Sequence, residues 1–112
     1  MRRAVITGLG IVSCIGNTKE AVAKSLREGI SGISKSQEQE EHGFRSRIHG
    51  KPEIQVEDFV DKRQLRFMGD GAAFNFIAMQ NAIIDSGLEE KEVSNERTGL
   101  IVGSGGPSTK NI

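Results

Sequence analysis

The sequence has little of several features that mark common protein classes. Its 112 residues include one cysteine, two prolines, five phenylalanines and no tryptophan or tyrosine. A single cysteine cannot form an internal disulfide, so nothing indicates an oxidising compartment. Fifteen basic residues balance fifteen acidic ones, which argues against nucleic-acid and membrane-surface binding, since both normally need a basic excess. No apolar run approaches the roughly 20 residues of a membrane span. These absences favour a soluble cytoplasmic α/β protein.

The N-terminal part of the sequence predicts a strand, a turn and a helix. Residues 4–12 (AVITGLGIV) are apolar and rich in β-branched side chains, which is typical of a strand buried on both faces. Asn17 is the predicted N-cap of the helix, and Glu20 three positions later gives a capping-box-like arrangement. Gly29 is placed to end the helix in the left-handed conformation.

The middle of the sequence is polar and has little periodicity. Residues 31–60 are long for a connection within a compact domain, so we expect a surface excursion of hairpin and loop. Residues 45–50 predict a short edge strand there, because Pro52 keeps this region out of a central sheet. A short helix or helical turn is expected within residues 58–68.

The last third predicts a long helix and a second strand. The helix spans residues 71–86, with Asp70 as its cap and Gly87 after its last turn. Apolar side chains cover most of its circumference, which predicts that other elements bury it. Residues 98–102 (TGLIV) predict another doubly buried strand.

These elements do not close a core by themselves. A two-stranded sheet is not stable alone, and strands that are apolar on both faces need neighbours and cover. We therefore expect that the rest of the fold is missing from these 112 residues or comes from another chain.

Two glycine clusters suggest sites where a ligand or a backbone comes close. Gly8 and Gly10 resemble the start of the dinucleotide-binding fingerprint G-x-G-x-x-G. However, Ser13 occupies the position of the third glycine, and the acidic residue expected about 20 positions further on is absent. The pattern therefore does not indicate a nucleotide site. Residues 103–106 (GSGG) follow the second strand and fit either a tight turn or the wall of a pocket.

The residues with nucleophilic or metal-binding chemistry are few. Cys14 has no histidine or cationic neighbour in the sequence to lower its thiol pKa, so it fits a small buried packing residue better than a nucleophile. His42 and His49 are seven residues apart, without further cysteines or paired carboxylates, and form no metal signature. We expect no metal and no cofactor.

Lys62, Arg63 and Arg66 form a small basic patch in one short helical stretch (DKRQLRF). Local charge runs are most often solvated faces, and Asp61 and Asp70 partly offset this one. The alternative is a surface that attracts an acidic partner electrostatically.

Four motifs are spread over essentially the whole sequence: RRAVITGLGIVSCIGN, LREGISGI, RFMGDGAAF and TGLIVGSGGPS. Their order resembles the N-terminus of the β-ketoacyl-acyl-carrier-protein synthases, and most of all the type I bacterial condensing enzymes of fatty-acid synthesis. The resemblance implies a thiolase-like fold, a mixed sheet covered by helices, in homodimers. It makes residues 1–112 the N-terminal segment of the synthase N-terminal domain. It also implies decarboxylative Claisen condensation of an acyl thioester with malonyl-acyl-carrier protein.

The resemblance places the catalytic cysteine and both catalytic histidines beyond residue 112, so this chain alone is expected to be inactive. It assigns Lys62, Arg63 and Arg66 to docking of the acyl carrier protein. It assigns Gly106 to the lining of the acyl pocket, where a glycine leaves room. Pro107 departs from the more glycine-rich run of the family. The competing hypothesis is a non-enzymatic binding module that uses the glycine-rich turns or the basic patch.

Overall fold

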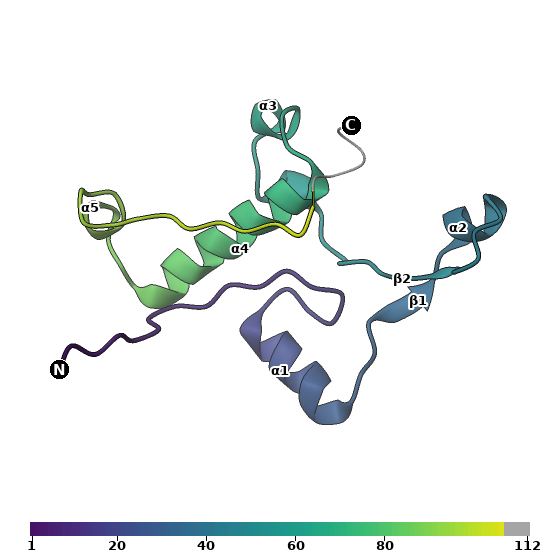
Figure 1. The fold of residues 1–112 in the computed structure, drawn as a ribbon, viewed down its shortest axis with the longest axis horizontal. Coiled ribbons are helices and arrows are strands. Elements are labelled where there is room, and N and C mark those ends of the chain that lie inside the picture. Colours follow the sequence, from purple (N-terminus) through teal and green to yellow (C-terminus); the bar gives the residue numbers. More distant parts are fainter. Residues whose placement is uncertain (107–112) are drawn as a thin grey trace. The chain divides into compact units, whose positions relative to one another are not determined.

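The computed structural model describes residues 1–106, which form one long helix, several shorter ones and one small sheet (Figure 1). In chain order the elements are α1 (Lys19–Glu28), β1 (Ile33–Lys35), α2 (Gln37–Glu41), β2 (Ile48–Gly50), the 3-10 helix η1 (Val56–Asp58), α3 (Lys62–Leu65), α4 (Asp70–Ser86) and α5 (Glu90–Val93). The chain divides into two compact units. We call Ile11–Ile54 the hairpin unit, and Met1–Gly10 with the residues from Gln55 onward the long-helix unit. The mixed α/β class expected from the sequence is confirmed.

In the hairpin unit, α1 begins one residue later than predicted. Thr18, not Asn17, is the N-cap: its side-chain oxygen accepts a hydrogen bond from the backbone N–H of Ala21 at 3.2 Å. The prediction of Asn17 as the cap was wrong because its side chain bonds elsewhere, as described below. The predicted end of the helix is confirmed, since Gly29 has φ 65° and its N–H bonds the carbonyl of Ser25.

The predicted excursion is a β-hairpin. Strands β1 and β2 pair antiparallel, with Ile33 opposite Gly50 and Lys35 opposite Ile48. The short helix α2 lies between them in sequence, and buried Ser36 ties it to the hairpin. The Ser36 hydroxyl caps α2 through the N–H of Gln39, while its own N–H donates to the carbonyl of Arg47 at 2.8 Å. The edge strand expected within residues 45–50 is thus confirmed over its last three residues.

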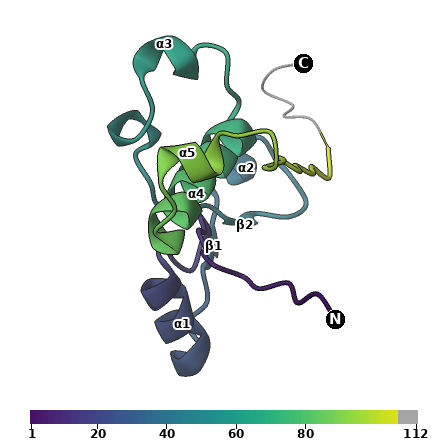
Figure 2. The same cartoon turned by 90° about the vertical axis from the view of Figure 1, so that its left-hand side faces the viewer.

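In the long-helix unit, α4 is the main element (Figure 2). It begins at Asp70 after an N-cap at Gly69, so the predicted capping role of Asp70 was wrong. The predicted end of α4 is confirmed, since Gly87 follows its last residue in the left-handed conformation, with φ 68°. Burial of the helix is only partial: Ala73 and Ile77 are buried, and Val60 joins them as the third buried apolar residue of the described part of the chain.

The two long apolar strands predicted at 4–12 and 98–102 are not strands in the described residues. Both segments are irregular chain without ladder hydrogen bonds, and neither carries an arrow in Figure 1. A strand needs neighbours that take up its backbone N–H and C=O groups, and residues 1–106 supply none for these segments. Their side chains are correspondingly exposed, 91% for Ile6 and 96% for Ile101.

Candidate functional site

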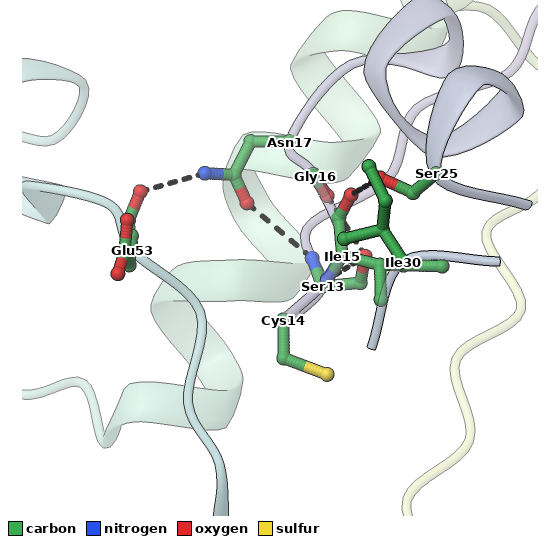
Figure 3. A pocket seen from close by; sticks show the side chains of 8 residues that line it. All are labelled: Ser13, Cys14, Ile15, Gly16, Asn17, Ser25, Ile30 and Glu53. Carbon is green, nitrogen blue, oxygen red and sulfur yellow. Dashed lines mark hydrogen bonds between the residues drawn. The ribbon is translucent and has the colours of Figure 1, made fainter. Parts of the chain in front are cut away.

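A hollow in the hairpin unit surrounds the tight turn that precedes α1. Ser13 and Gly16 exchange backbone hydrogen bonds of 3.1 and 3.3 Å, and the Ser13 hydroxyl donates to the Gly16 carbonyl at 2.8 Å. Gly16 has φ 149°, a conformation that side-chain-bearing residues rarely adopt. The hollow has a volume of about 270 Å³ (Figure 3). Its lining residues are Ser13, Cys14, Ile15, Gly16, Asn17, Ser25, Ile30 and Glu53.

Asn17 and Ser25 hold this turn in place. The Asn17 amide donates to the backbone carbonyl of Glu53 at 2.8 Å, and its oxygen faces the N–H of Ser13 at 3.4 Å (Figure 3). The buried Ser25 hydroxyl donates to the carbonyl of Ile15 at 2.8 Å. Neither role was predicted from the sequence, because an asparagine before a helix indicates a cap, and the carbonyl of Glu53 is distant in sequence.

Cys14 packs against two glycines of the hairpin region. A Cβ on Gly32 would collide with the backbone oxygen of Cys14 and lie 2.8 Å from its sulfur, and one on Gly50 would lie 3.0 Å from that sulfur. Within residues 1–106 the half-buried thiol makes no hydrogen bond to a histidine or a basic side chain. This environment supports the interpretation of Cys14 as a packing residue.

In the described residues neither histidine forms a hydrogen bond with the Cys14 thiol. His42 bonds through Nδ1 to the backbone carbonyl of Glu38 at 2.8 Å, and His49 is a residue of β2. Among the described residues no three histidine, cysteine, aspartate or glutamate side chains gather in a way that could hold a metal ion.

The first glycine cluster lies against the backbone of α4 and not against a ligand site. A Cβ on Gly10 would collide with the carbonyl oxygen of Ala78, and one on Gly8 with that of Ala82. Between them the N–H of Leu9 donates to the Asp85 carboxylate at 3.0 Å. The expected close approach of a backbone is confirmed, and because α4 occupies the face of these glycines, a pyrophosphate has no room there.

The predicted basic patch lies on α3 and the turn that follows it. Asp61 caps this short helix by accepting the N–H of Arg63 at 2.7 Å. Lys62, Arg63 and Arg66 are exposed, and in the described part of the chain none of them pairs with an acidic side chain. Both interpretations of these three cations, a solvated face and a surface for an acidic partner, stay predictions.

Gly106 is the last described residue and lies in a tight turn. The Ser104 hydroxyl donates to its carbonyl at 2.7 Å, and a Cβ on Gly106 would meet no atom within 4 Å. A side chain would therefore have room at this position, and the role of Gly106 in an acyl pocket stays a prediction. Pro107, where the sequence departs from the family pattern, lies outside the described residues.

A family model and individual relatives all relate this chain to β-ketoacyl synthases. The sequence model of the family described as "Beta-ketoacyl synthase, N-terminal domain" matches residues 1–112. The chain is 48% identical over 111 residues to 3-oxoacyl-[acyl-carrier-protein] synthase 1 of Haemophilus influenzae, covering 99% of this chain and 27% of the relative. It is 49% identical over 111 residues to the Escherichia coli synthase 1, covering 98% of this chain and 27% of the relative.

A more distant relative is 3-oxoacyl-[acyl-carrier-protein] synthase 2 of Vibrio harveyi, 35% identical over 105 residues, covering 93% of this chain and 25% of the relative. The chain thus spans about a quarter of the length of the curated relatives it matches. Within residues 1–106, no helix is both long and apolar enough to cross a membrane.

Proposed function

The chain belongs to the β-ketoacyl synthase family, and from that premise we propose that the protein elongates acyl chains by decarboxylative Claisen condensation with malonyl-acyl-carrier protein. The observation that carries the proposal is the match of the family's N-terminal domain over all 112 residues, together with 48% identity to a synthase 1. The alternative of a non-enzymatic binding module that uses the glycine-rich turns or the basic patch is not favoured, because the relatives matched along the whole chain are synthases.

In the proposed reaction the acyl group is first held as a thioester on a nucleophilic cysteine. The malonyl group then loses its carboxylate as carbon dioxide, and the electron pair left on its central carbon attacks the acyl carbonyl. The new carbon–carbon bond forms as the thioester bond to the cysteine breaks, and two histidines assist decarboxylation and stabilise the developing negative charge.

We place all three catalytic residues outside this chain. Cys14 is not the proposed nucleophile, because it packs against Gly32 and Gly50 and forms no hydrogen bond with a base in the described residues. Residues 1–112 are the N-terminal segment of the synthase N-terminal domain in this proposal. Their contribution is structural and positional, and the chain alone has no condensing activity.

Lys62, Arg63 and Arg66 are the proposed docking residues for the acyl carrier protein, which the relatives' names give as the carrier of their substrate. The support is their shared exposure on one helical turn and the lack of an acidic partner within residues 1–106. Unpaired surface cations attract an acidic protein and raise its rate of association.

The remaining parts of the proposal concern the fold around this chain. We propose a thiolase-like fold, in which residues 4–12 and 98–102 become strands of a larger mixed sheet. The exposed side chains of these segments support this, because they gain burial only when further strands and helices cover them. Gly106 lines the acyl pocket, and the protein works as a cytoplasmic homodimer.

Calorimetry with purified acyl carrier protein tests the docking proposal. In the full-length native protein, Lys62→Glu with Arg66→Glu is expected to weaken binding roughly 30-fold, because two attractions of about 0.5 kcal/mol each become repulsions of similar size. Lys24→Glu with Arg27→Glu makes the same charge change on α1, where both side chains are exposed, and should leave the affinity unchanged. Equal affinity of both double variants would refute docking on α3.

A further inference from the structure

We draw no further inference here: the strongest candidate, the hollow beside α2 lined by Glu38, Gln39, His42 and Phe44, has one buried side-chain oxygen without a hydrogen-bond partner within residues 1–106, that of Gln39, but nothing in the structure shows whether a ligand or the rest of the protein covers it.

Discussion

Adding one methyl group to Gly10 should separate the N-terminal segment from α4. A Cβ at this position collides with the carbonyl oxygen of Ala78 and lies 2.8 Å from both the carbonyl carbon of Ala78 and the nitrogen of Ala82. All three are backbone atoms of a continuous helix, so they cannot move aside as a flexible side chain can. The φ angle of Gly10 is not positive, and the cost of Gly10→Ala is therefore steric.

The size of the effect follows from two contributions. Overpacking a close contact costs about 1–3 kcal/mol when the structure has to shift. A shift of the segment also weakens the hydrogen bond from Leu9 to the Asp85 carboxylate, and a hydrogen bond to a charged group is worth about 1.5–3 kcal/mol. The free energy of unfolding should therefore fall by about 2–5 kcal/mol in Gly10→Ala.

Urea unfolding of the full-length native protein measures this loss. Gly71→Ala is the matched control, since a Cβ there meets nothing within 4 Å and the residue lies in the first turn of α4. An alanine in that helix should stabilise by about 0.5–1 kcal/mol. A loss of less than about 0.5 kcal/mol in Gly10→Ala would refute the close packing of the N-terminal segment on α4.

Two further substitutions test the hairpin unit. Thr18→Ala removes the side-chain acceptor of the Ala21 N–H and should cost about 1 kcal/mol in urea unfolding; no measurable loss would contradict the assignment of Thr18 as the cap. Cys14→Ser keeps the small size that Gly32 and Gly50 require of this residue, and the full-length protein should retain its condensing activity in a steady-state assay. A loss of activity of about a million-fold, the size found when a nucleophile is removed, would show instead that Cys14 takes part in the chemistry.

Local sequence signals predicted the helices well, because the residues that end a helix act on its own last turn. Gly29 and Gly87 both take the left-handed conformation expected of them. The first residues of the helices were predicted less well, because Asn17, Thr18 and Asp70 all have side chains that can act as an N-cap. Only the bond to the carbonyl of Glu53, remote in sequence, shows why Asn17 is not the one used.

Strands could not be predicted in the same way, because their hydrogen bonds are made to other segments. Residues 4–12 and 98–102 have the composition of buried strands, yet the described chain brings them no neighbour. The short hairpin of β1 and β2 forms because both of its strands lie within one stretch of sequence. The expectation that these 112 residues do not close a core agrees with the three buried apolar residues found among residues 1–106.

In the candidate site, too, features set by local sequence were predictable and features set by remote contacts were not. The exposure of Lys62, Arg63 and Arg66 was predictable from their polar local sequence, and the close approach at Gly8 and Gly10 from their lack of side chains. The hollow beside Cys14 was not predictable, because Asn17 and Glu53 close it across 36 positions of sequence.

Turnover by the full-length native protein tests the central claim most directly. Supplied with acyl-acyl-carrier protein and malonyl-acyl-carrier protein, the protein should release carbon dioxide and give a β-ketoacyl-carrier protein with two more carbons, detectable by intact mass. Residues 1–112 alone should give neither. Absence of the β-ketoacyl product with the full-length protein, or turnover by residues 1–112 alone, would contradict the account.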